Sequence, residues 1–472
     1  MKKIPAYYLF ALVVFMALNA CRKAETNPEI QAESAKLFNI NDVPEIKLQF
    51  SLAEWNRLLA NYDLNPKNET NVVSKFTYTL NGKNTNLDSI GVKLRGNSSR
   101  RRPEGSFGQT HNTVNPEWNH CHFGLDFTKY KSGRYFSGLD KMILKWFKDD
   151  ANYVREIYCY DLFKRYGVWT APRASYTKLS IYVEGDSKPA YYGVYSMIEQ
   201  IDSYFIAYRE KLWGPGVGNL WKCTYNLNGP ADLVSIKDMG VEDVKLDPSK
   251  SKYFTYDLKT NKSQLETAKT ELSAFITNLN TKTGADFEQW IAQKMDVDLF
   301  LKTYAVNVLV GMWDDYWGNG NNYYLYFSPN GKVYFIPYDY DNTLGTSLSS
   351  FYFNTGTQDL LNWGKMRESP LITKILQIEK YRNKYKSYIT ELASPGKNLF
   401  NAESSMSRIV QWQNMISPYV ANDTGEDMNI QDLPASWGTE SYYRLLSGND
   451  AAGQNGPANY FKTRIKNIPW LN

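Results

Sequence analysis

The segment 296–345 constrains the fold most, because its local structural signals follow one another without a gap. Asp296 is a good N-cap for a helix with apolar residues at helical spacing, and this helix is expected to end near Gly311. Two apolar runs, 323–327 and 333–337, are joined by a Ser-Pro-Asn-Gly turn and predict a β-hairpin. One acidic loop precedes this hairpin and another follows it. We therefore expect both acidic loops at the same end of a two-stranded unit.

The residues of these two loops suit phosphoryl transfer. This reaction needs hard oxygen ligands for Mg²⁺ and a carboxylate that orients or deprotonates the acceptor hydroxyl. Protein kinases place that Asp in a loop after a helix, an Asn five residues later, and a metal-binding Asp after a hairpin. Asp314 and Asn319 have this spacing, and Asp339 and Asp341 follow the hairpin. The spacing predicts Asp314 as the catalytic residue, and Asn319, Asn322 and either Asp339 or Asp341 as metal ligands. The alternative is that these residues only cap a helix and shape turns.

The rest of the chain predicts an α+β fold, strand-rich in its N-terminal part and helix-rich in its C-terminal part. A strand at 46–50 precedes a short helix at 53–62 and a hairpin spanning 76–94. A helix is expected over 150–166, followed by a second hairpin over 175–198. Later helices are expected at 371–392 and 406–416, where apolar residues again recur at helical spacing.

The N-terminus predicts export. Lys2 and Lys3 precede the apolar run 9–18, which is too short to span a bilayer and stops at Asn19-Ala20-Cys21. This pattern is typical of a lipoprotein signal peptide over 1–21, with Cys21 as the lipidated new N-terminus. Ordinary secretion with Cys21 left free is the alternative. We expect a protein anchored in the cell envelope by lipid, on the periplasmic side or the outer surface.

The domain organisation follows from composition. Residues 22–42 lack a hydrophobic period and are expected to be a flexible tether. Hydrophobic residues make up 43% of the chain and aromatic residues 15%, which is enough to bury a large core. We expect one domain over 43–395 and an extension of unknown role over 396–472. A net charge of +5 is mild, and the sequence has no basic run with interleaved aromatics, so nucleic-acid binding is not favoured.

Cysteine and histidine give a weaker signal. The remaining cysteines, Cys121, Cys159 and Cys223, allow at most one disulfide among them. His120 and His122 would share one face of a strand, which makes a zinc site conceivable. A polar loop and edge strand is the preferred interpretation, because no fourth ligand stands at a recognisable spacing.

Several motifs together resemble the CotH-type spore-coat protein kinases, an atypical kinase family. The first is Val92-Lys93-Leu94-Arg95-Gly96-Asn97-Ser98-Ser99, and the last is Ile336-Pro337-Tyr338-Asp339-Tyr340-Asp341. Between them lie, in the order of the family, the matching runs 160–163, 192–195, 199–202, 218–222, 313–316 and 322–326. The agreement covers about 44–346. The stretch 111–122 departs from the pattern, because the family has a more basic segment there.

The resemblance implies a two-lobed kinase-like fold that binds ATP with Mg²⁺ or Mn²⁺ and phosphorylates Ser or Thr of a protein acceptor. It implies the catalytic role for Asp314 and the metal-binding role for Asp339 and Asp341. Arg95 and Asn97 fall in a segment that looks like a phosphate-side loop. Glu199 is expected to orient a cation, either Lys145 or Lys222, that binds the nucleotide phosphates.

Two other functions fit parts of the sequence. The run 336–344 also resembles the first motif of haloacid-dehalogenase-type phosphatases, with Asp339 as nucleophile and Asp341 as acid. That motif normally opens a parallel sheet with alternating strands and helices, which the sequence does not predict here. The third possibility is an inactive lipoprotein whose acidic loops bind calcium or a partner.

Overall fold

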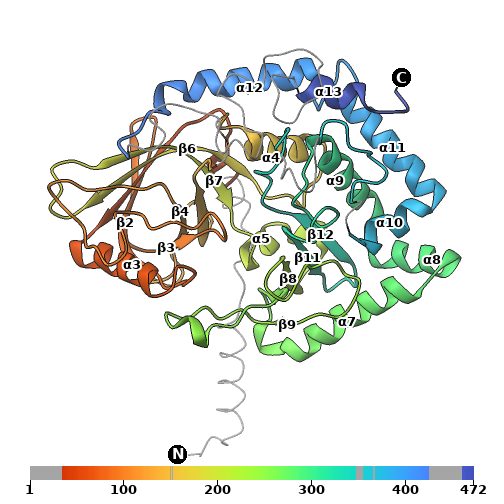
Figure 1. Cartoon of the computed structure of the whole chain (residues 1–472), viewed down its shortest axis with the longest axis horizontal. Helices are drawn as coiled ribbons and strands as arrows, with labels where there is room; N and C mark the ends of the chain where they lie inside the picture. The colour runs from red at the N-terminus through yellow and green to blue at the C-terminus, as the bar shows by residue number, and fades with distance from the viewer. Residues whose placement is uncertain are drawn as a thin grey trace, which may run out of the picture.

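The first seven strands form a closed barrel. The computed structural model describes residues 34–148, 150, 152–346, 355–364, 367–424 and 460–471, so the predicted signal peptide and Cys21 lie outside the described residues. The barrel order is β1-β2-β3-β4-β5-β7-β6. Its strands are β1 (Glu45–Phe50), β2 (Val72–Leu80), β3 (Lys83–Arg95), β4 (His122–Asp126), β5 (Lys141–Lys145), β6 (Ala174–Val183) and β7 (Ala190–Glu199). Figure 1 shows the barrel on the left, from red to yellow.

Alternating burial explains why these strands close on themselves. Along β1 every second side chain is buried, and the buried ones, Ile46, Leu48 and Phe50, point into the barrel. Parallel pairing of β1 with β6 closes the barrel. The helix α3 (Leu52–Leu64) begins at an N-cap, Ser51, and adds the fully buried Trp55 to the same core.

A second sheet and most of the helices make up the rest of the molecule. The sheet order is β12-β11-β8-β10-β9. These strands are β8 (Asn219–Cys223), β9 (Met239–Gly240), β10 (Tyr256–Leu258), β11 (Tyr323–Phe327) and β12 (Val333–Pro337). The helices are α4 (Arg155–Arg165), α5 (Ser203–Tyr208), α6 (Glu210–Trp213), α7 (Leu265–Thr281), α8 (Gly284–Lys294), α9 (Val297–Val310), α10 (Pro370–Gln377), α11 (Glu379–Ala393), α12 (Ala402–Ile416) and α13 (Tyr460–Lys466).

The helix α9 lies at the centre of this second part. It is apolar on nearly every side, which is typical of a helix enclosed by other elements. Asp296 caps its N-terminus, and Gly311 ends it in the left-handed conformation at φ 73°. The structure thus confirms the predicted helix and the predicted hairpin β11–β12 that follows. It also confirms the mixed α and β composition, with strands concentrated in the N-terminal part and helices in the C-terminal part.

Three boundaries differ from expectation. The helix predicted over 150–166 begins only at Arg155, because the Asp150 carboxylate accepts the backbone N–H groups of Val154 and Arg155 and holds the preceding residues in a loop. The single helix expected over 371–392 is two helices, α10 and α11, separated at Ile378. Within the expected tether, Leu37 and Phe38 are buried in the barrel core, so the packed part of the chain begins before residue 42.

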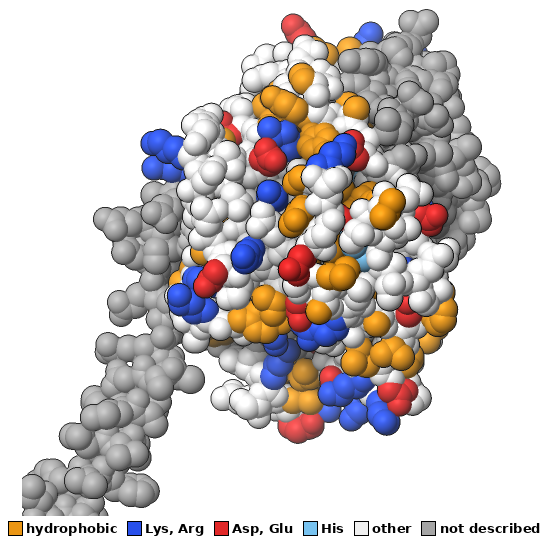
Figure 2. Space-filling view, turned by 90° about the vertical axis from the view of Figure 1, so that its left-hand side faces the viewer, with side chains coloured by type: hydrophobic (Ala, Val, Ile, Leu, Met, Phe, Trp, Pro, Cys, Tyr) orange, Lys and Arg blue, Asp and Glu red, His pale blue; other side chains and the backbone are white. Residues whose placement is uncertain are grey.

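The C-terminal segments belong to the same core. Tyr158 on α4 bonds Ser405 on α12 at 2.7 Å, and Tyr460 on α13 donates to the Leu309 carbonyl at 3.1 Å. The cysteines Cys121, Cys159 and Cys223 are free and buried. Over the barrel face in Figure 2, basic and acidic side chains are interspersed with hydrophobic ones. Among the described helices, none combines the length and the apolar character that a membrane span requires.

Candidate functional site

A pocket of about 370 Å³ collects most of the predicted site residues. Its walls come from the barrel strands β3, β4 and β5, from β8 of the second sheet, and from the two acidic loops. The predicted residues that line it are Arg95, Asn97, Lys145, Lys222, Asp314, Asn322, Asp339 and Asp341. Residues that lie between positions 95 and 341 of the sequence thus meet in one place. The predicted residues Asn319 and Glu199 are not part of the lining.

Three asparagines hold Asp314 in place. Its Oδ1 accepts from the side-chain amides of Asn319 at 2.7 Å and Asn321 at 3.1 Å, and its Oδ2 accepts from Asn322 at 3.0 Å. Burial raises the pKa of Asp314 to about 6, although the amide donors act in the opposite direction. A carboxylate with a pKa near neutrality, fixed in a pocket, is suited to accept a proton from a hydroxyl group. Asn319 therefore contacts Asp314, and its predicted role as a metal ligand stays a prediction.

The neighbouring Asp315 shapes the loop and does not face the pocket. Its carboxylate accepts the Gly318 backbone N–H at 2.7 Å and the Asn307 amide at 2.9 Å. Asn307 in turn accepts a hydrogen bond from the Tyr340 hydroxyl at 2.7 Å. Because Tyr340 stands between Asp339 and Asp341, this chain of hydrogen bonds connects the two acidic loops through a residue of α9.

Lys145, the last residue of β5, is paired with three carboxylates. Its ammonium lies 2.9 Å from Glu156 and 3.0 Å from Asp341, and it also bonds Asp339. Burial opposes the charge, but the surrounding carboxylates raise the pKa of Lys145 well above its ordinary value. Lys145 therefore stays charged in the pocket lining, beside the two carboxylates that follow β12.

Glu156, in the first turn of α4, is the site residue that the sequence did not reveal. One carboxylate oxygen pairs with Lys145, while the other accepts from the Tyr160 hydroxyl at 3.1 Å and the Tyr340 backbone N–H at 3.2 Å. Its side chain is 5% exposed. Glu156 thus ties Lys145 to the loop that carries Asp339 and Asp341. The sequence does place a glutamate near the start of a predicted helix, but only the tertiary packing shows which residues it faces.

The expectation that Glu199 orients Lys145 or Lys222 is wrong. The Glu199 carboxylate bonds the guanidinium groups of Arg173 and Arg209, each at 2.7 Å. These two arginines hold the pKa of the buried Glu199 at about 2. Glu199 ends β7 on the side of the barrel that packs against α5, so its role is structural.

The predicted phosphate-side loop follows β3. Gly96 has φ 107°, and a Cβ at this position would lie 2.7 Å from the Ser99 hydroxyl oxygen, so the turn requires glycine. The Arg100 Nε donates to the Gly96 carbonyl at 3.0 Å and fixes the turn. Arg95 donates to the Gln200 side chain at 2.8 Å and still faces the pocket.

The acidic residues after β12 fit a divalent cation that is shared with a phosphorylated ligand. The Asp341 Oδ1 is buried and has no hydrogen-bond partner among the described residues. Asp339 adopts φ 64°, a left-handed conformation that costs a non-glycine residue about 1 kcal/mol or more and is common at functional sites. Within the described residues, no three His, Cys, Asp or Glu side chains form a metal site by themselves. Mg²⁺ commonly takes one or two carboxylates and completes its shell with water and phosphate.

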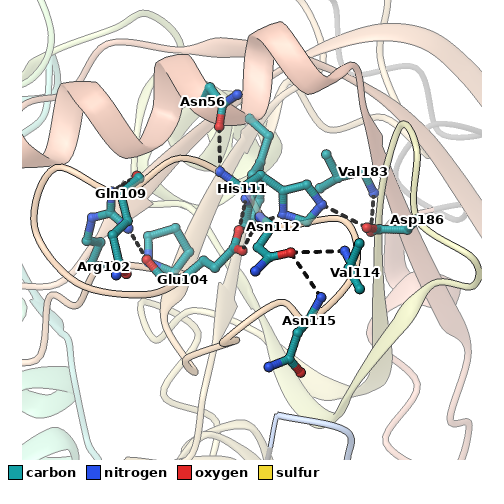
Figure 3. A network of polar contacts seen from close by, with 12 residues as sticks. Asn56, Arg102, Glu104, Gln109, His111, Asn112, Val114, Asn115, Val183 and Asp186 are labelled. Atoms are coloured by element: carbon teal, nitrogen blue, oxygen red, sulfur yellow. Dashed lines mark hydrogen bonds and ion pairs between the residues drawn. The ribbon is translucent and has the colours of Figure 1, made fainter.

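The three histidines have separate environments. His111 lies between Glu104 and Asp186, at 2.7 Å from each carboxylate (Figure 3). His120 contacts the Tyr192 carbonyl at 3.0 Å and stacks on Trp146. His122 lines the pocket. The three side chains thus have different polar partners, although His120 and His122 both lie beside Trp146.

The phosphatase alternative does not fit the topology. That motif requires Asp339 to follow a strand of a parallel sheet, whereas β12 pairs antiparallel with β11.

Comparisons with known proteins agree with the resemblance. Inner spore coat protein H of Bacillus subtilis is 24% identical over 298 residues, which cover 63% of this chain and 73% of that protein. Invasin CotH7 of Rhizopus delemar is 27% identical over 169 residues, or 35% of this chain and 28% of the invasin. The chain thus spans less than a third of that invasin. The family described as CotH kinase protein matches residues 92–447, about three quarters of the sequence. The chain therefore belongs to the CotH kinase protein family.

Proposed function

We propose that the protein is an ATP-dependent protein kinase that transfers the γ-phosphate to a Ser or Thr hydroxyl of a protein acceptor. The observation that carries the proposal is the convergence of Asp314, Lys145, Asp339 and Asp341 on one pocket. Its lining comes from both the barrel and the helix-rich part, so we propose that these parts act as two lobes around the nucleotide. The sequence of 1–21 supports the further proposal that the kinase is exported and anchored in the cell envelope through Cys21.

Each side chain has a defined task in this proposal. Asp314, fixed by its three asparagine donors, accepts the proton of the acceptor hydroxyl. Lys145, oriented by Glu156, contacts the phosphates, and Arg95 and Lys222 add positive charge on two further walls. Asp339 and Asp341 would hold Mg²⁺ or Mn²⁺, and Asn322 lines the same pocket. When bound, the metal neutralises charge on the phosphates during transfer.

Calorimetry with ATP, in the presence and absence of Mg²⁺, tests the proposal. The parent protein should bind ATP only with the metal, and Asp341→Ala should lose this binding, because the phosphates lose their counter-ion. Asp314→Asn should bind normally, yet transfer of labelled phosphate to a mixed Ser/Thr peptide library should fall by roughly 10² or more. Tight calcium binding without any nucleotide binding would instead support an inactive lipoprotein.

A further inference from the structure

Three neighbouring barrel strands present a row of nitrogen-bearing side chains to the pocket. In the β3–β4 pair, Arg95 stands opposite His122. In the β4–β5 pair, Phe123 stands opposite Leu144, so the next position along places His122 opposite Lys145. Directly opposed residues point to the same face of a sheet. All three side chains line the pocket, while the alternate residues Phe123 and Leu144 face the barrel core.

A backbone hydrogen bond fixes which nitrogen of His122 carries its proton. The Trp146 backbone N–H donates to the His122 Nδ1 at 2.9 Å, so Nδ1 is the acceptor and the neutral ring carries its hydrogen on Nε2. Burial, followed by the charge of Lys145, lowers the pKa of His122 to about 3. An imidazolium carries hydrogen on both nitrogens, so an Nδ1 that accepts a hydrogen bond requires the neutral ring. Only 3% of the residue is exposed.

We propose that His122 is a phosphate-binding residue, whose Nε2–H donates to a polyphosphate oxygen between the contacts made by Arg95 and Lys145. This inference rests on the proposed nucleotide binding and adds a residue that neither the kinase motifs nor the spacing argument assigned. A neutral donor between two cations has a clear advantage. It adds a directed hydrogen bond to the anion without placing a third positive charge in a row of adjacent strands, where like charges repel.

Gly124 supports the same geometry. It is two residues after His122 on β4, on the same face. A Cβ at Gly124 would lie 2.9 Å from the Arg95 Cδ, so the missing side chain leaves the room in which the Arg95 stem runs toward the pocket. The sequence of β4 therefore combines a small residue beside Arg95 with a donor between Arg95 and Lys145.

Two substitutions of His122 separate its donor from its structural role. In His122→Asn, the side-chain oxygen can replace Nδ1 as the acceptor for Trp146, but no atom reaches the position of Nε2. In His122→Gln, the longer amide reaches that position with an N–H. His120→Asn is the matched control, because His120 also packs on Trp146 but does not line the pocket.

The measurement is calorimetry of the full-length protein with Mg²⁺ and a non-hydrolysable ATP analogue, and separately with Mg²⁺ and tripolyphosphate. A hydrogen bond to a charged group contributes about 1.5 kcal/mol, so His122→Asn should weaken both ligands by about tenfold. His122→Gln should stay within about threefold of the parent, and His120→Asn should match the parent. Adenosine, used as a competitor, should bind the parent and His122→Asn equally.

Several results would overturn the inference. One is a His122→Asn protein that binds both ligands as tightly as the parent. Another is a His122→Asn protein that loses adenosine affinity by the same factor as ATP-analogue affinity, which would place His122 beside the adenine base. A parent protein that binds tripolyphosphate but not the ATP analogue would contradict the kinase proposal, while phosphate binding by Arg95, His122 and Lys145 would still hold. A parent that binds neither ligand would remove both.

Discussion

Replacing Lys145 with methionine removes the cation that is paired with Glu156, Asp339 and Asp341. Breaking a buried ion pair by deleting one partner costs roughly 3–5 kcal/mol of folding stability. Most of this cost comes from Glu156, because its carboxylate, at 5% exposed, would be left buried without a counter-ion. Asp339 and Asp341 are 33% and 31% exposed, so water screens part of their charge. We therefore expect the lower end, about 3 kcal/mol. At about 2 °C per kcal/mol for a large domain, the melting temperature should fall by about 6 °C.

Differential scanning fluorimetry with and without Mg²⁺ tests this value. Because the three carboxylates of the Lys145→Met protein lack a counter-ion, Mg²⁺ alone should raise its melting temperature more than that of the parent. Lys222→Met is the control, since Lys222 lines the same pocket, where its ammonium lies 5.8 Å from the centre of the Tyr338 ring. A Lys145→Met protein that melts within about 1 °C of the parent, with no extra response to Mg²⁺, would refute the assigned electrostatic role.

Three further predictions concern the surrounding framework. His111 is buried, but its ion pairs with Glu104 and Asp186 raise its pKa. The stability that these ion pairs contribute should be complete below about pH 6.5 and should be lost as the pH rises through the raised pKa of the folded state. The melting temperatures of the parent and of His111→Asn should therefore converge in alkaline buffer. Glu199→Gln leaves Arg173 and Arg209 without their carboxylate, so the free energy of unfolding in urea should fall by about 3 kcal/mol or more. ATP affinity at low temperature should stay unchanged. A large loss of affinity would mean that Glu199 acts in nucleotide binding. Asn307→Leu removes the donor to the Asp315 Oδ2 and the acceptor of the Tyr340 hydroxyl, and should cost about 2–3 kcal/mol, against about 1 kcal/mol for Tyr340→Phe. Equal losses in the two variants would contradict the connecting role of Asn307.

Local signals predicted much of the framework. The hairpin β11–β12 has the bounds expected from its apolar runs and turn, because a short apolar run and the chemistry of a turn depend on a few neighbouring residues. The same holds for α9, whose N-cap Asp296 and terminal Gly311 are visible in the sequence. These two elements already place Asp314 and Asp339 near each other, so the acidic half of the pocket was predictable.

The basic half of the pocket was not predictable from local pattern. Glu156 meets Lys145 only because α4 packs its first turn against the end of β5, and the sequence does not state which strand a helix end faces. The resemblance assigned Glu199 to the nucleotide site, but Arg173 and Arg209 bind it from segments outside the β6–β7 hairpin. His122 looked like a zinc ligand or a loop residue until the register beside Arg95 was known. Cross-strand register depends on the whole barrel and not on the composition of one strand.

The parallel pairing of β1 with β6 has a consequence for how the chain folds. Glu45 is paired with Lys178, so the edge of β1 that pairs with β6 stays uncovered until more than a hundred further residues have been synthesised. Contacts this distant in sequence carry a large loop-closure cost and form slowly. Until β6 arrives, the growing chain is an open sheet with an exposed strand edge that other chains could pair with. A nascent chain that ends before residue 174 should therefore aggregate, and the barrel can close only once the β6 strand is complete.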